Sequence, residues 1–90
     1  MPGVRAIVVG AVQGVGFRYA TRRVANQLGV TGWVRNRPDG SVEAWAQSEP
    51  GPLAEFVGFL RTGPPGAHVR AVETIEVDED DTLQGFDVRF

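Results

Sequence analysis

The sequence predicts an α+β fold, a split βαβ sandwich in which an antiparallel sheet of four to five strands has two helices on one face. The main observation is the order of the segments, which is strand, helix, strand, strand, helix, strand and one further short strand. Glycine or proline separates most of these segments. Because the chain has only 90 residues and no low-complexity tract, we expect a single domain over residues 1–90.

The first strand and the first helix follow from the spacing of apolar residues. Val4 to Val12 place apolar side chains on both faces, which is typical of a central strand. After them, apolar residues recur at helical spacing and Gly29 follows as the helix end; the recurring residues are Phe17, Ala20, Val24 and Leu28. A short segment with two glycines, Gln13 to Gly16, connects this strand to this helix.

A hairpin and a second helix are predicted next. Thr31 to Arg37 and Ser41 to Gln47 are expected to pair as strands, because Pro38-Asp39-Gly40 between them has the residues of a tight turn. Ser48 is the expected N-cap of the helix. The apolar stripe that should pack on the sheet consists of Leu53, Phe56, Val57 and Leu60.

The last two strands are expected at Val69 to Val77 and at Phe86 to Phe90. A helix joins the first strand to the strand at residues 31–37, so these two strands should run parallel, with the strand at residues 41–47 between them. Their C-terminal ends then lie at the same edge of the sheet. This topology brings Asn36 towards the segment that follows Val12.

The segment Val12-Gln13-Gly14-Val15-Gly16-Phe17-Arg18 is the most informative part of the chain. Two glycines one residue apart let the backbone fold back at the start of a helix, where converging main-chain N–H groups form a socket for an anion. Arg18 adds a planar fork of donors that matches phosphate oxygens. The pattern therefore predicts a phosphate-binding site.

The residues near this segment offer little other chemistry. The chain has no cysteine, its one histidine, His68, is expected in an exposed turn, and no carboxylate lies in or beside the glycine segment. Hydrolysis of an ordinary phosphate ester needs a metal, an activated nucleophile or a general acid. The leaving group of an acyl phosphate is a carboxylate that departs without a proton. Such a substrate needs only a held phosphoryl group and an aimed water, which the side chain of Asn36 could orient.

The same residues resemble a known family. Gly10 to Arg18 closely resembles the first signature of the acylphosphatases, and Gly32-Trp33-Val34-Arg35-Asn36 resembles the second. Leu60 to Pro65 and Gly85 to Phe90 match the later pattern of the family. The resemblance implies a ferredoxin-like sandwich and an acylphosphate phosphohydrolase, a hydrolase of acid anhydrides that acts without metal or cofactor.

The resemblance also implies roles for individual residues. Arg18 matches the phosphate-binding arginine and Asn36 the water-positioning asparagine. The main-chain cradle for the phosphate matches Gln13, Gly14, Val15, Gly16 and Phe17. Inorganic phosphate is then both a product and a competitive inhibitor.

Composition narrows the partners. A net charge of −2 argues against nucleic-acid binding, which needs a basic surface. No segment approaches the ~20 apolar residues of a membrane span, and no secretion signal is evident at the N-terminus. We therefore expect a cytoplasmic monomer whose partner is a small-molecule acyl phosphate.

Two other classes of function stay open. A non-catalytic module that senses an anion or another small molecule would keep the glycine segment without turnover, although the intact Asn36 argues against it. RNA-binding modules share this element order, but they need paired aromatic motifs on the central strands and a basic face. Here those strands supply only Trp45. We expect Trp33 and Trp45 to pack on the sheet, and Arg22 and Arg23 to project into solvent.

Overall fold

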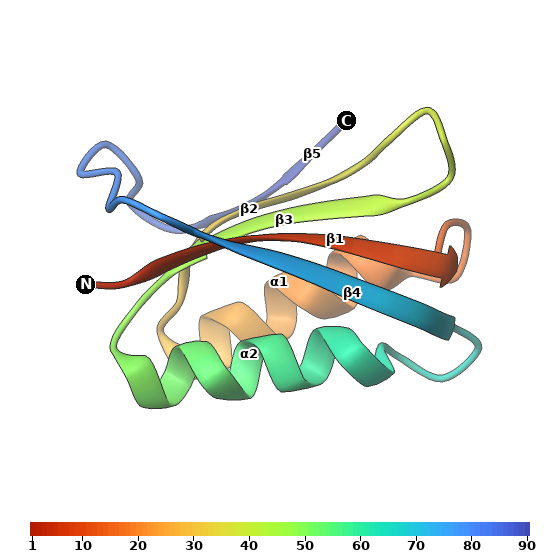
Figure 1. Ribbon diagram of the computed structural model, residues 1–90, viewed down its shortest axis with the longest axis horizontal. Helices are drawn as coiled ribbons and strands as arrows, with labels where there is room; N and C mark the ends of the chain where they lie inside the picture. The colour runs from red at the N-terminus through yellow and green to blue at the C-terminus, as the bar shows by residue number, and fades with distance from the viewer.

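Figure 1 shows the computed structural model, which describes residues 1–90 as a five-stranded sheet with two helices on one face. This is the α+β sandwich predicted from the sequence, and every expected strand and helix is present. The elements in chain order are β1 (Gly3–Ala11), α1 (Phe17–Leu28), β2 (Thr31–Asn36), β3 (Val42–Gln47), α2 (Pro50–Thr62), β4 (His68–Val77) and β5 (Phe86–Arg89).

The strand order across the sheet is β4-β1-β3-β2-β5. β3 lies between β1 and β2 and is antiparallel to both, so β1 and β2 run in the same direction, as predicted. In register, Val8 of β1 faces Val42 of β3, and Asn36 of β2 faces the same residue from the other side. The C-terminal ends of β1 and β2 therefore lie at the same end of the sheet.

The sheet is mixed and not wholly antiparallel, because β5 pairs parallel with β2. β4 is antiparallel to β1, and its last residue, Val77, lies opposite Gly3. After β4 the chain crosses this end of the sheet and enters β5 beside the start of β2, where the Gly32 N–H donates to the Gly85 carbonyl at 2.8 Å. Because β5 starts at the end of the sheet where β2 also starts, the two strands run in the same direction.

The core lies between the sheet and the helices. The strands contribute small residues that are fully buried, among them Ala6, Val8, Val34, Val42 and Ala44, and the helices contribute larger ones, Phe17, Phe56 and Leu60. Small side chains on the sheet let the helices approach closely, and the aromatic rings fill the space that remains. Two residues of the predicted stripe on α2, Phe56 and Leu60, lie in the core. The other two, Leu53 and Val57, are half-buried at the margin of the core.

The start of α2 differs from the prediction. The N-cap is Glu49 and not Ser48, and no side chain accepts a hydrogen bond from the first turn. The Ser48 hydroxyl instead donates to the Glu49 carbonyl at 2.9 Å. Pro50 occupies the first helical position, where its missing N–H costs nothing and its fixed φ favours the helix. The proline therefore sets the boundary one residue later than a serine cap would.

The face of the sheet without helices is covered by its own side chains. Glu43 is only 3% exposed and accepts hydrogen bonds from the guanidinium groups of Arg5 and Arg35. Trp33 and Trp45 face each other across β2 and β3, and both are half-buried. The guanidinium of Arg89 lies 4.7 Å from the ring centroid of Trp33. Arginine side chains thus shield much of the aromatic surface from water.

Candidate functional site

The segment between β1 and α1 has the backbone form that its glycines predict. Gly14 and Gly16 both have φ of 76°, in the left-handed region, whereas Val15 between them does not. A Cβ added at either glycine would meet nothing within 4 Å, so glycine is required there by backbone conformation and not by lack of space. Alternation between left- and right-handed residues turns successive N–H groups towards the same side and forms a concave nest.

The N–H groups of this nest have no partner within the protein. Outside the helices and strands, no main-chain hydrogen bond is donated by residues 13 to 16. Within α1, the first donor to find an acceptor is Ala20, which bonds the Gly16 carbonyl at 3.0 Å. The N–H groups of residues 17 to 19 are therefore also free, as at any helix start. Seven unpaired N–H donors thus lie in a row at the positive end of a helix dipole, an arrangement that can bind an anion.

Phe17 anchors the nest to the core. Its side chain is only 2% exposed and packs against Phe59 of α2, with the ring centroids 6.2 Å apart. The ring also fills the space beside Gly63, where an added Cβ would lie 2.7 Å from its Cε2 atom. The residue that begins α1 is thus held by the end of α2, as expected for a core anchor.

Arg18 is half-buried at the same helix start, and it has no carboxylate partner. Its Nη1 donates to the Arg89 carbonyl at 3.2 Å, and its guanidinium lies 4.6 Å from the ring centroid of Phe90. Neither Arg89 nor Phe90 was predicted to be part of the site. The signal was present only in the topology, since the end of a strand parallel to β2 must reach the edge where Asn36 lies.

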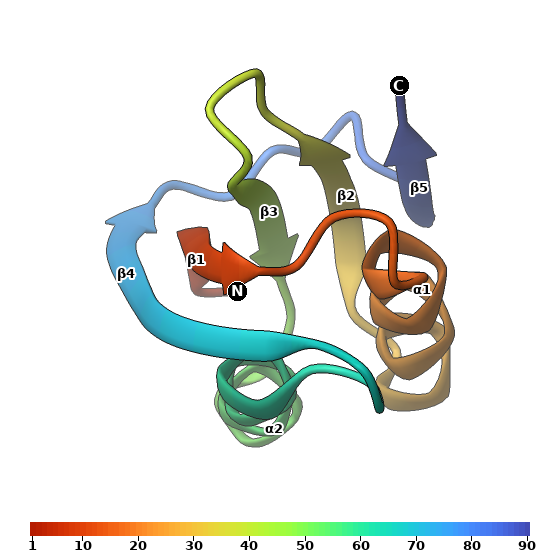
Figure 2. The ribbon, with the colours of Figure 1, turned by 90° about the vertical axis from the view of Figure 1, so that its right-hand side faces the viewer.

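Asn36 is the last residue of β2 and is half-buried. Its carboxamide makes no hydrogen bond within the protein, although the backbone turn that follows it is well ordered by hydrogen bonds. The Arg37 N–H donates to the Ser41 carbonyl at 2.8 Å, and the Gly40 N–H donates to the Arg37 carbonyl at 3.1 Å. Figure 1 shows this turn and the β1–α1 segment at the same end of the sheet, and Figure 2 faces that end directly.

The charges around the site are positive. Residues 1–38 contain six arginines and no carboxylate side chain. The first acidic residue is Asp39, whose carboxylate accepts hydrogen bonds from the hydroxyl and the N–H of Ser41 at 2.6 and 3.0 Å. These two bonds hold the pKa of Asp39 below its ordinary value. Asp39 therefore stays ionised and braces the turn, while Arg22 and Arg23 on α1 are exposed, as expected.

His68 is exposed, as predicted, but it does not lie in a turn. It is the first residue of β4 and faces Ala11, the last residue of β1. This register places His68 at the same end of the sheet as the nest. No hydrogen bond joins His68 to Arg18 or Asn36, and no group of three or more His, Cys, Asp or Glu side chains is placed to hold a metal ion.

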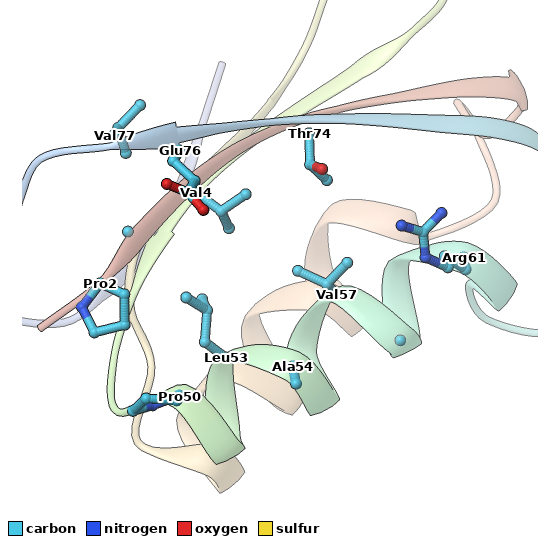
Figure 3. Close-up of a pocket in the computed structure, with 12 residues that line it drawn as sticks. Pro2, Val4, Pro50, Leu53, Ala54, Val57, Arg61, Thr74, Glu76 and Val77 are labelled. Atoms are coloured by element: carbon cyan, nitrogen blue, oxygen red, sulfur yellow. The ribbon is translucent and has the colours of Figure 1, made fainter.

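The largest cavity is elsewhere. A groove of about 610 Å³ lies between α2 and the strands β1 and β4, and none of the residues predicted for phosphate binding lines it. Figure 3 shows Leu53 and Val57 directed towards Val4 and Thr74, with Arg61 at one end. A phosphoryl group held by main-chain N–H groups needs only a shallow nest and not a deep cavity.

Neither α1 nor α2 has the length and apolar character that a membrane-spanning helix requires.

Known proteins resemble this chain in sequence and in fold. A family model described as acylphosphatase matches residues 4–88. The acylphosphatase of Trichormus variabilis is 49% identical over 86 residues, which cover 96% of this chain and 84% of that protein. The acylphosphatase of Rubrobacter xylanophilus is 50% identical over 86 residues, which cover 96% of this chain and 78% of that protein. The crystal structure of acylphosphatase from Bacillus subtilis matches with a TM-score of 0.95 at 36% identity and covers 100% of both chains. The chain therefore belongs to the acylphosphatase family.

Proposed function

We propose that this protein hydrolyses the carboxyl–phosphate bond of acyl phosphates, with residues 13–18 holding the phosphoryl group and Asn36 aiming the water. The observation that carries the proposal is the combination of unpaired main-chain N–H groups with Arg18 at the start of α1. The free carboxamide of Asn36 lies at the end of the neighbouring parallel strand. These groups bind, neutralise and orient, which is all that a labile anhydride requires.

The phosphoryl group is held by two kinds of donor. The main-chain N–H groups of Gln13 to Phe17 surround its oxygens, and Arg18 supplies a charged pair of N–H donors in one plane. One Arg18 nitrogen already donates to the Arg89 carbonyl, which leaves the remaining N–H groups for phosphate. Negative charge on the phosphoryl oxygens is stabilised by donors that are already in place before the reaction begins.

The water is the only nucleophile required. The side-chain carbonyl of Asn36 accepts a hydrogen bond from the water and directs it at phosphorus, while the acyl carboxylate leaves without a proton. The proton of the water passes to a phosphoryl oxygen of the substrate itself. The products are a carboxylate and inorganic phosphate, and phosphate competes with substrate for the same nest.

Several further properties belong to the same proposal. We infer that residues 1–90 act as one domain and as a monomer in the cytoplasm, and that catalysis needs no metal or cofactor. The main support for metal independence is chemical, since a carboxylate leaving group of low pKa needs no Lewis acid to depart. The alternative is an anion-sensing module on the same fold, which would bind phosphate without turnover.

Turnover separates the enzyme from the sensor. Purified protein with benzoyl phosphate should release inorganic phosphate, and EDTA should leave the rate unchanged. Binding of phosphate without any hydrolysis would establish the sensor instead. A rate that falls with EDTA and returns with added metal would contradict the cofactor-free mechanism.

Asn36→Ala tests how the water is held. We expect kcat to fall on the order of 10²–10³-fold, as when a single positioned polar group is lost from an active site. The inhibition constant for inorganic phosphate should stay close to the wild-type value, because Asn36 does not contact the held phosphate. Initial rates at several phosphate concentrations measure both quantities. An equal loss of turnover and phosphate binding would make Asn36 a structural residue.

A further inference from the structure

The side chain of Gln13 connects the two halves of the proposed site. Its Nε2 donates to the Arg37 carbonyl at 2.8 Å and to the Ser41 carbonyl at 2.9 Å. Gln13 is the first residue of the nest, and Arg37 directly follows Asn36. The two acceptors lie 24 and 28 residues along the chain, so these contacts are tertiary and not part of a local turn.

Both acceptors are carbonyl oxygens, and this fixes the chemistry of the contact. The –NH₂ end of the Gln13 carboxamide supplies two donors side by side, one for each oxygen, whereas its carbonyl end supplies none. A carboxylate at position 13 would face two oxygens and be repelled by them. The same two carbonyls also close the turn, because the Gly40 N–H donates to Arg37 and the Arg37 N–H donates to Ser41. The Gln13 amide therefore completes the hydrogen bonding of the turn from outside.

We propose that the Gln13 side chain is a positioning residue that sets the register between the phosphate nest and Asn36. The expected effect on catalysis rests on the proposed function, whereas the hydrogen bonds of the Gln13 side chain do not depend on it. The nest lies on the connection after β1, whereas Asn36 is the last residue of β2. Without the side-chain contact each half can keep its own shape, but the distance between phosphorus and the aimed water is no longer fixed.

A second glutamine provides a matched control at the other end of the sheet. The Gln47 Nε2 donates to the Asp80 carbonyl at 2.9 Å, and the Asp80 N–H donates to the Gln47 Oε1 at 2.8 Å. Gln47 thus joins β3 to the loop of residues 78–85 between β4 and β5, also with two hydrogen bonds and across 33 residues of sequence. It touches neither the nest nor the turn after Asn36.

The test replaces each glutamine by methionine, which keeps length and charge and removes the donors. For Gln13→Met we expect kcat with benzoyl phosphate to fall about tenfold, since misplacement by an ångström costs up to ~10²-fold. The inhibition constant for phosphate should change less than about twofold, because the nest and Arg18 remain. Hydrogen exchange of the Arg37 and Gly40 N–H groups should become faster. Gln47→Met should keep the wild-type kcat even if it lowers the melting temperature as much.

The outcomes separate the two proposals. Unchanged kcat in Gln13→Met, or a parallel loss of kcat and phosphate binding, would overturn the positioning role. A similar fall of kcat in Gln47→Met would also overturn it, because the effect would then be one of general stability. If the wild type does not hydrolyse benzoyl phosphate, the proposed function fails on its own. Unchanged exchange at Arg37 and Gly40 would overturn the contact whether or not the protein turns over.

Discussion

The two helices begin in different ways, although both present the positive end of a dipole. At α1 the N–H groups of Phe17, Arg18 and Tyr19 have no acceptor within the protein, and the first N–H to be paired is that of Ala20. At α2 the first turn contains Pro50 and Pro52, which have no N–H, and the Leu53 N–H donates to the Glu49 carbonyl at 3.1 Å. Only Gly51 is left as a free donor.

The charge beside each helix start also differs. Arg18 follows the nest at α1, whereas the N-cap of α2 is the carboxylate-bearing Glu49. A dipole equivalent to about half a charge is common to both ends. Three features distinguish the proposed anion site from an ordinary helix start. They are the number of free N–H donors, the backbone conformation before the helix, and the sign of the charge on the neighbouring side chain. Variants at Arg18 and Gly16 test the charge and the backbone conformation, and a variant at Phe90 tests a contact of Arg18.

The largest effect is expected from removal of the cation. Arg18→Ala should lower kcat/KM on the order of 10³-fold and raise the inhibition constant for phosphate at least about tenfold, because a charged bidentate donor is lost. Arg23→Ala is the control, since Arg23 is exposed on the same helix and outside the nest. Phosphate that protects the Arg18 variant at the wild-type concentration would show that the anchor is elsewhere.

A smaller effect is expected from the backbone. Gly16→Ala places a side chain at φ of 76°, which costs about 1–2 kcal/mol or changes the nest. We expect lower stability and roughly tenfold weaker phosphate binding. Gly51→Ala in the first turn of α2 does not require a positive φ and lies away from the nest, so it should leave phosphate inhibition unchanged. Urea unfolding and phosphate inhibition measure the pair. Equal behaviour of the two alanines would remove the distinction between the two helix starts.

The smallest effect is expected at Phe90. Its ring lies against the Arg18 guanidinium but is 92% exposed, and exposed contacts of this kind contribute about 0.5–1 kcal/mol. Phe90→Ala should therefore raise the inhibition constant for phosphate about two- to fivefold, while Phe90→Tyr, which keeps the ring, should not. Isothermal titration with phosphate would detect this. An identical loss in both variants would assign the effect to something other than the ring.

Much of the fold could be predicted from the sequence because each signal was local. Alternating apolar residues marked the strands, the Pro38-Asp39-Gly40 turn fixed the hairpin, and the crossover rule set the order of the central strands. The direction of β5 was not predicted, because a strand of four residues carries no information about its neighbour. The start of α2 was misplaced by one residue, because the sequence pattern favours a serine cap over a proline at the first helical position.

Some residues of the proposed site were predicted from the sequence and others were not, for a similar reason. Gly14, Gly16 and Arg18 are adjacent in sequence, so the nest was visible at once, and topology supplied Asn36. The contacts of the Gln13 side chain and of Arg18 with Phe90 could not be foreseen, because they join residues 24 to 72 positions apart whose approach depends on the finished sheet.

The Glu43 contact on the solvent side of the sheet has a consequence for acid resistance. Burial alone would raise the pKa of Glu43, but the hydrogen bonds from Arg35 and Arg5 outweigh it and leave the pKa below the ordinary value of 4.5. The stabilisation is therefore present above the pKa of the unfolded chain and is lost as pH falls through the lower, folded value. Neither a guanidinium nor a carboxamide changes its charge in mild acid. Protonation of Glu43 should therefore contribute to the acid unfolding of the chain.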